Sequence, residues 1–349
     1  MIIMEKPNTI QQLLLALFGV VLFMMPTPAR ASGVPGDLND DMQVNVSDVT
    51  FLIDVLLNGE PQWTQDVNGD GKVNIGDVTS LITYLLSGGG DWPWPAPIPG
   101  MPSNGVIYTV NGYSFVMVPI QGGTFMMGST VSGEYASPVH QVTLSDYSIG
   151  MTEVTIGLWK AVTGSYPSYG YIPGYDSDAT PIYFCSWDGA KEFIARLNEV
   201  TGLNFRLPTE AQWEFAARGG NLSHGYTYSG SDNLDEVGWY SLNFENPSPS
   251  PSIILECMPV AQKAPNELGL YDMSGNVSEF CEDNLSAYAY PSAEPQTDPV
   301  YYSPQSDLVS RVVRGGNAYD TERVCTVTNH SGHAKHGVET LGVGFRLAL

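Results

Sequence analysis

Oxygen-bearing side chains recur at the same offsets in two twelve-residue segments, which begin 29 residues apart at Asp37 and Asp66. Each segment has carboxylates at positions 1, 5 and 12, amides at positions 3 and 9, and a backbone carbonyl available at position 7. Ca²⁺ takes six to eight oxygen ligands at about 2.4 Å, and this spacing can supply them. The ligands predicted in this way are Asp37, Asn39, Asp41, Gln43 and Asp48 in the first segment, and Asp66, Asn68, Asp70, Lys72 and Asp77 in the second.

One amphipathic helix is expected after each loop, over residues 49–57 and 78–86. A calcium loop followed by an exit helix, used twice, resembles the type I dockerin over residues 35–90. The resemblance implies a small all-α module that folds around two Ca²⁺ ions and docks onto a cohesin-like protein. Met42 stands at position 6 of the first loop, where the turn favours glycine, so the first site is expected to be the weaker. The alternative, an acidic linker that binds nothing, does not account for a duplicated coordination pattern.

Residues 1–31 have the pattern of a secretory signal peptide. Lys6 lies in a short polar start, an apolar run extends from Leu13 to Met25, and Ala29-Arg30-Ala31 offers small residues for cleavage near Ala31. The run is too short to span a bilayer, so no permanent membrane anchor is expected. We therefore expect a secreted, extracellular protein, associated with a cell surface only through a partner.

The charge of the chain excludes one class of partner. The formal net charge is -23 and the pI is about 4.3, so the surface repels nucleic acid, and no basic patch offsets that repulsion. The four cysteines, too few for disulfides to organise a chain of this size, are Cys185, Cys257, Cys281 and Cys325. Four cysteines allow three full disulfide pairings, and the sequence is equally compatible with no disulfide at all.

Residues 91–105, rich in Pro, Gly and Trp, are expected to be a linker, and residues 106–349 a single large domain. Two helices are expected in this domain, over 187–200 and 209–218. Thr209 and Gln212 have the spacing of a capping box for the second helix. The remaining pattern indicates short strands and many ordered loops.

Several sequence blocks follow one another through the large domain in a recognisable order. They are Phe115–Gly128, Met151–Thr155, Ser186–Ala190, Arg206–Arg218, Asn266–Glu279, Arg314–Gly316 and Gly344–Leu347. The set resembles the formylglycine-generating enzyme family, also called sulfatase-modifying factor domains. The resemblance implies an α+β domain with a variant of the C-type lectin fold. In the Arg206–Arg218 block, Glu210 and Glu214 are expected to pair with arginines, while Trp213 and Phe215 fill the core.

The turn that contains Asn276 and Glu279 resembles the calcium turn of this family. The resemblance implies a further Ca²⁺ held by oxygens of these residues, with a structural role. This chain has Ser278 where most relatives place a tryptophan.

The resemblance also implies a catalytic position. In the authentic enzymes, two cysteines shortly after the Arg-Gly-Gly block bind Cu(I), and oxygen then oxidises a substrate cysteine. Here Cys325 falls at the second position of that pair, but Asp320 occupies the first, and Asn317 replaces the usual serine. A carboxylate is a hard ligand and a poor partner for Cu(I), so neither copper binding nor formylglycine synthesis is expected.

Three histidines follow in a Gly-rich stretch, at His330, His333 and His336. The glycines argue against a helix that would cluster the imidazoles, so we expect a solvated surface loop. The alternative is a metal site formed with Cys325 or Asp320.

Three hypotheses for function follow from these patterns. The first is a secreted, mostly non-catalytic module that binds a glycan or a protein and is placed by its dockerin in an extracellular complex acting on polysaccharide. An exposed aromatic platform would favour it, and the candidates are Trp239, Tyr240, Tyr288, Tyr290, Tyr301 and Tyr302. The second is an oxidase of altered specificity centred on Cys325, which requires a free, accessible thiol. The third is a protein whose calcium repeats are only a rigid spacer, with no cohesin partner.

Overall fold

The structure is a computed structural model. It describes residues 38, 45–58, 75–86, 101–131, 134, 136–167, 177–244, 257–284, 293–301, 310–330, 334–335, 338 and 340–349. The expected signal peptide lies outside these residues, as do most of the linker and every calcium-loop ligand except Asp48 and the backbone of Asp77. Among the described residues, no helix has the length and apolar character needed to cross a membrane.

The N-terminal module contains the two helices that the repeat predicts, α2 (Val46–Asn58) and α3 (Ile75–Leu86). Their apolar faces pack together through Val49, Leu52, Val78 and Leu81, all of which are buried. Both helices begin three residues before the predicted start. At the start of α2, the side chain of Asn45 accepts a hydrogen bond from the N–H of Ser47 (2.8 Å) and so caps the extra turn.

The described strands of the large domain form three sheets. One sheet has the order β1 (Val106–Val110), β2 (Tyr113–Ile120), β5 (Tyr147–Gly150), and another has the order β3 (Thr124–Met127), β4 (His140–Thr143), β8 (Gln296–Thr297). The largest has six strands in the order β10 (Ala334–Lys335), β9 (Ser310–Arg314), β7 (Ser278–Asn284), β12 (Val343–Gly344), β6 (Phe184–Cys185), β11 (Thr340–Leu341). Pairing is mostly antiparallel, while β12 runs parallel to both β6 and β7.

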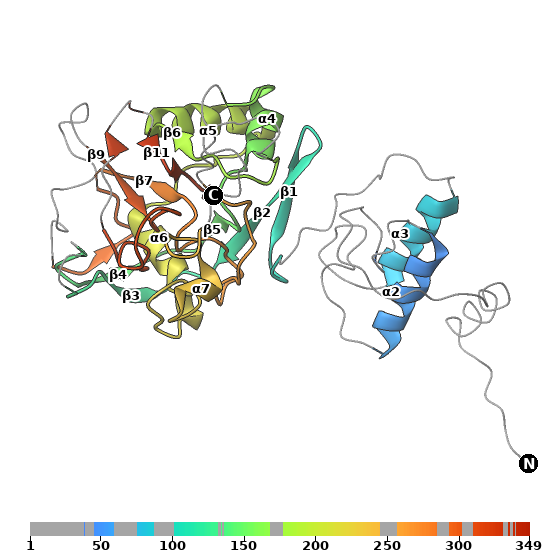
Figure 1. The fold of residues 1–349 in the computed structure, drawn as a ribbon, viewed down its shortest axis with the longest axis horizontal. Coiled ribbons are helices and arrows are strands. Elements are labelled where there is room, and N and C mark those ends of the chain that lie inside the picture. Colours follow the sequence, from blue (N-terminus) through green and yellow to red (C-terminus); the bar gives the residue numbers. More distant parts are fainter. Residues whose placement is uncertain are drawn as a thin grey trace, which may run out of the picture.

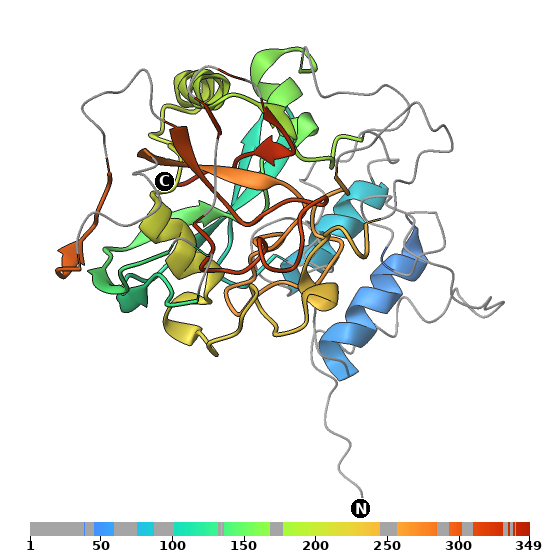
Figure 2. The ribbon, with the colours of Figure 1, turned by 60° about the vertical axis from the view of Figure 1, so that its left-hand side comes forward.

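Helices cover both faces of the six-stranded sheet. The described helices of the large domain are α4 (Ile156–Thr163), α5 (Trp187–Thr201), α6 (Glu210–Ala217) and the short α7 (Leu234–Val237), with a 3₁₀ turn η2 (Gly220–Leu222). In both ribbon views β7 lies between α5 and α6 (Figure 1, Figure 2). Successive side chains of a strand point to opposite faces, and Phe280 accordingly packs in the cluster that contains α4 and α5, while Cys281 packs in the cluster that contains α6. This double burial explains why β7 lacks an alternating polar pattern.

Most sequence expectations for the large domain are confirmed. The helix expected over 187–200 is α5, and the side chain of Ser186 caps it by accepting from the N–H of Gly189 (3.1 Å). The capping box of α6 forms as predicted between Thr209 and Gln212. The expected α+β class is therefore correct. The expectation of only two helices is incomplete, because α4 and α7 also form.

Candidate functional site

The expected catalytic cysteine lies in a turn that follows β9. Cys325 is fully buried in a small apolar cluster with Leu234, Val237 and Tyr240. Its sulfur packs so closely on Gly316 that a Cβ added to this glycine would lie 2.9 Å from Sγ. Burial raises the pKa of the Cys325 thiol, and the nearby carboxylates of Asp320 and Glu322 raise it further. The thiol is therefore protonated at neutral pH and shielded from reagents in solution.

Asp320, at the first position of the family's cysteine pair, belongs to a compact backbone turn. Its Oδ2 accepts a hydrogen bond from the N–H of Asn317 (3.0 Å), and its own N–H donates to the carbonyl of Asn317 (3.0 Å). The N–H of Ser241 donates to the Asp320 carbonyl (3.0 Å), which ties this turn to the segment after α7. Burial raises the pKa of the Asp320 carboxyl, while the bond from Asn317 opposes that rise. The side chain thus has a structural partner.

A copper ion does not fit this pair of residues. Cu(I) prefers soft thiolates, but the turn supplies one buried thiol and one carboxylate that is already bonded to the backbone. Within the described part of the chain, no group of three or more His, Cys, Asp or Glu side chains is placed to hold a metal ion. None of the four cysteines forms a disulfide. The oxidase hypothesis requires an accessible thiol at Cys325, and the structure contradicts that requirement.

The turn expected to bind calcium in the large domain has other partners. Both oxygens of Glu279 accept hydrogen bonds from Arg346, each at 2.5 Å, and Oε2 also accepts from the indole N–H of Trp213 (2.8 Å). Asn276 donates from its side chain to Glu153 (3.0 Å) and accepts from the N–H of Met258 (2.9 Å). Both residues are buried. Asn276 and Glu279 thus have buried protein partners, with Arg346 bound to Glu279, and the calcium site at this turn stays a prediction.

Arg346 is surrounded by three buried carboxylates, those of Glu153, Asp272 and Glu279. Arg346 also donates to the carbonyls of Gly150 (3.0 Å) and Tyr271 (2.9 Å). Burial raises the pKa of Asp272 to about 6 and raises the pKa of Glu153 well above its usual range, while the charge of Arg346 opposes both shifts.

A second arginine lies on the same face of the sheet, because Arg314 of β9 is the cross-strand partner of Glu279. Arg314 pairs with Glu210 (2.8 Å) and Glu214 (2.6 Å), as expected from the Arg206–Arg218 block. Arg218 also pairs with Glu214 (2.8 Å). His330 contacts the same oxygen of Glu210 and is buried, which corrects the expectation of a solvated loop at this position. His333 and His336 lie outside the described residues.

The one calcium-loop ligand whose side chain the structure describes is Asp48. It stands at position 12 of the first loop, and its carboxylate is fully buried. Oδ1 accepts from the N–H of Leu38 (2.7 Å), at loop position 2, and Oδ2 accepts from the N–H of Asn45 (2.8 Å), at position 9. The carboxylate therefore lies against the backbone of positions 2 and 9 of its own loop, and a calcium ligand at position 12 has to turn back to its loop in this way.

The aromatic residues proposed as an exposed platform do not form one in the described part of the chain. Tyr240 is buried, and its hydroxyl donates to Glu322 (3.2 Å). The ammonium group of Lys263 lies 4.0 Å from the centre of the Trp239 ring. Tyr301 packs against the core and donates to Gln296 (2.6 Å). Tyr288, Tyr290 and Tyr302 lie outside the described residues.

Two sets of neighbours could not be read from the sequence pattern. Tyr240 and Glu322 lie 82 residues apart, and Glu279 and Arg346 lie 67 residues apart, yet each pair is in contact. The only local signal was the charged residue itself inside an apolar block, since a buried charge requires a partner.

Fold and site together define an α+β scaffold organised by buried arginine–carboxylate groups, with one shielded thiol at the expected reactive position. The model of the "Sulfatase-modifying factor enzyme 1-like domain" family matches residues 112–349, and the chain belongs to this family. The "Dockerin type I domain" model matches residues 35–86 and 64–98, so the chain also carries dockerin repeats. Dockerins in general bind calcium and cohesin-type partners, and the proteins that carry them are typically extracellular.

Three relatives place the large domain among known proteins. The "Chaperone protein LppX" of Paenibacillus barcinonensis is 36% identical over 208 residues, which cover 47% of this chain and 70% of that protein. The formylglycine-generating enzyme of Thermomonospora curvata is 32% identical over 175 residues, or 48% of this chain and 55% of the enzyme. The solved structure of Treponema denticola variable protein 1 is 30% identical with a TM-score of 0.58, and the alignment covers 70% of this chain and 98% of that one.

Proposed function

We propose that this protein is a secreted, non-catalytic binding module, which its dockerin repeats place in an extracellular complex that acts on polysaccharide. The observation that carries the proposal is the state of the expected reactive position. A single thiol lies fully buried there, and the residue at the other position of the pair is the carboxylate of Asp320. Soft-metal redox chemistry needs two thiolates at this place, so the scaffold is left with a binding role.

The fold supports a binding role. Loops held on a rigid, doubly covered sheet are suited to recognition, although the fold alone names no ligand. A relative with 36% identity has the name of a chaperone, and a chaperone acts by binding.

The dockerin repeats supply the docking function in this proposal. Asp48 fits a calcium ion, because two backbone N–H groups hold its buried carboxylate against positions 2 and 9 of its own loop. Bound calcium would supply a positive charge that holds the loop oxygens together. The helices α2 and α3, which follow the two loops, would then present a defined surface to a cohesin-like partner.

The proposal is tested by capturing partners from the producing cell's secreted and envelope fractions. The bait is the mature protein from residue 32 onwards, used with calcium, with a chelator, and as the double variant Asp37→Ala/Asp66→Ala. Asp54→Ala, which removes an exposed carboxylate of α2 outside the loops, is the matched control. We expect one partner to be captured by the wild type and by Asp54→Ala, but only in calcium, and to be lost in the double variant. Capture that ignores calcium and the loop variants would refute the docking role.

A further inference from the structure

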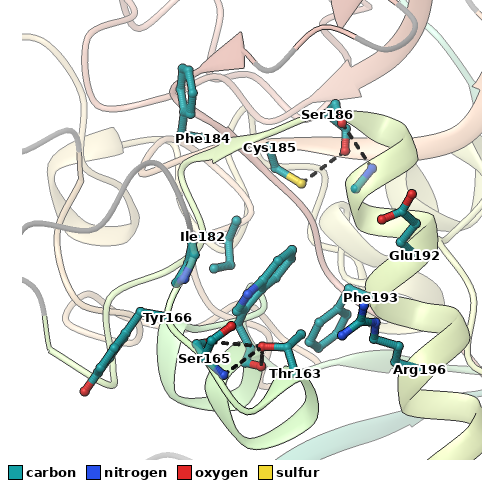
Figure 3. A pocket seen from close by; sticks show the side chains of 13 residues that line it. Thr163, Ser165, Tyr166, Ile182, Phe184, Cys185, Ser186, Glu192, Phe193 and Arg196 are labelled. Atoms are coloured by element: carbon teal, nitrogen blue, oxygen red, sulfur yellow. Dashed lines mark hydrogen bonds between the residues drawn. The ribbon is translucent and has the colours of Figure 1, made fainter.

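A pocket lies between α4 and the first half of α5. Its lining residues belong neither to the calcium repeats nor to the turn around Cys325. Its cavity volume is about 280 Å³. Figure 3 shows Tyr166 on one side and Glu192 and Arg196 of α5 on the opposite side. The lining side chains used below are Trp159, Tyr166, Ser186, Glu192 and Arg196.

The aromatic wall of this pocket is held in place before any ligand arrives. The ring of Trp159 stacks on buried Phe193, with centroids 5.1 Å apart and an interplanar angle of 13°. Tyr166 receives a hydrogen bond from Lys160 (2.9 Å), and the hydroxyl of Thr163 donates to the carbonyl of Trp159 (2.9 Å). A ligand would therefore lose little free energy to the ordering of these side chains.

Two opposite charges on the same helix face border the pocket. Glu192 and Arg196 stand four residues apart in α5, a spacing at which such side chains often pair. In the described part of the chain they form no ion pair or side-chain hydrogen bond, with each other or with another residue. One wall thus offers a carboxylate that accepts hydrogen bonds beside a guanidinium that donates several.

We propose that this pocket binds a neutral saccharide, and that it takes the end of a glycan chain. A sugar ring has an apolar C–H face, which suits the aromatic rings of Trp159 and Tyr166. Its hydroxyls both donate and accept, so neighbouring hydroxyls can bond to Arg196 and Glu192 together. The cavity of about 280 Å³ lies at the small end of ligand pockets, roughly 300–1,000 Å³, and so admits one or two units rather than a long segment.

Other ligand classes fit less well. A purely apolar ligand would strip water from Glu192, Arg196 and Ser186 without replacing their hydrogen bonds. An acidic glycan would be repelled by the carboxylate of Glu192 and by a chain whose formal net charge is -23. This assignment rests on the proposed binding role of the large domain, for which it supplies a site and a ligand class.

The test is calorimetric titration of the mature protein in calcium with hexaoses of β-1,4-glucose, β-1,4-xylose, β-1,4-mannose and α-1,4-glucose, and with hexagalacturonate as the acidic probe. Arg196→Ala and Glu192→Gln remove one polar contact each from exposed positions, so folding should be unaffected. Trp159→Ala removes the stacking face. Glu199→Gln, an exposed change on α5 away from the pocket, is the matched control.

We expect at least one neutral hexaose to bind with a stoichiometry of one. Arg196→Ala and Glu192→Gln should each weaken this binding about tenfold, Trp159→Ala should abolish it, and Glu199→Gln should leave it unchanged. The proposal fails if no neutral hexaose binds, if only hexagalacturonate binds, or if the Arg196 and Glu192 variants bind like the wild type. Calcium-dependent capture of a partner is measured separately, so the pocket can fail while the docking role stands.

Discussion

Two buried regions of the large domain differ in how closely they follow the pattern of the family. Around Arg346, the charged residues of the recognised blocks meet in a group with Glu279, Glu153 and Asp272. Around Cys325, the recognised Arg-Gly-Gly block leads into a turn that holds one shielded thiol and the carboxylate of Asp320. The first region stabilises the fold, whereas the second decides whether copper chemistry is possible. Matching blocks therefore establish the scaffold, and the activity has to be judged at single positions.

The difference has a physical basis. A buried arginine requires several acceptors at once, and Arg346 finds them on two carbonyls and a carboxylate that come from three segments. A buried cysteine behaves as a small apolar side chain and requires only packing, which Leu234 and Val237 provide. The stability of the Arg346 group thus depends on every one of its partners, whereas the turn around Cys325 tolerates substitutions that keep an apolar side chain.

The largest expected effect comes from breaking the Arg346 group. Arg346→Met leaves three carboxylates buried without their cation, and we expect the free energy of unfolding to fall by about 3–5 kcal/mol. Urea unfolding followed by circular dichroism measures the change. The control is Arg323→Met, at an exposed arginine, which should alter stability by no more than about 0.5 kcal/mol. Equal effects of the two substitutions would show that Arg346 has no special structural role.

The next effect is a dependence of stability on pH. Burial and the nearby charge of Glu210 together raise the pKa of Asp283 to about 7, above its unfolded value of about 3.9. The native state then binds more protons than the unfolded state between these two values, so the stability from this group is present below pH 4 and is lost as pH rises through 7. Its contribution to the slope is at most about 1.4 kcal/mol per pH unit.

Asp283→Asn should remove this part of the slope. Unfolding free energies of wild type and variant, measured from pH 5 to pH 8, should differ in slope, whereas Glu199→Gln should follow the wild type because Glu199 is exposed. Parallel curves for wild type and Asp283→Asn would contradict the raised pKa of Asp283.

The smallest expected effect is at the cysteine turn. Cys325→Ala removes a buried sulfur that makes only packing contacts, so we expect a loss of about 1 kcal/mol in the free energy of unfolding. Binding of oligosaccharide and of the docking partner should be unchanged. A loss of either binding activity with the fold intact would mean that Cys325 has a functional role that the packing does not show.

Local patterns were the most reliable guide to the structure. The capping box at Thr209 and Gln212 and the helix that begins at Trp187 depend on neighbours within a few residues, and both are confirmed. Helix α4 was missed, although Thr155 caps it and Gly164 ends it, because eight residues give too short a periodic pattern. The protein partners of Glu279 and His330 could not be predicted, because they come from segments more than 60 residues away. The pocket beside α5 could not be predicted from the sequence for the same reason, since α4, β6 and α5 each supply part of its lining.

The turn of Asp320 and Cys325 supplies too few thiolates to hold copper, and a Cu(I) titration against a competing chelator measures this property. Mature wild type and Cys325→Ser are titrated under reducing, oxygen-free conditions, and a cysteine peptide is then offered with oxygen. We predict that the wild type and the variant leave the chelator equally loaded and that the peptide is not oxidised. Binding of one Cu(I) per wild-type molecule that is lost in Cys325→Ser, with oxidation of the peptide, would show instead that this turn is a copper site.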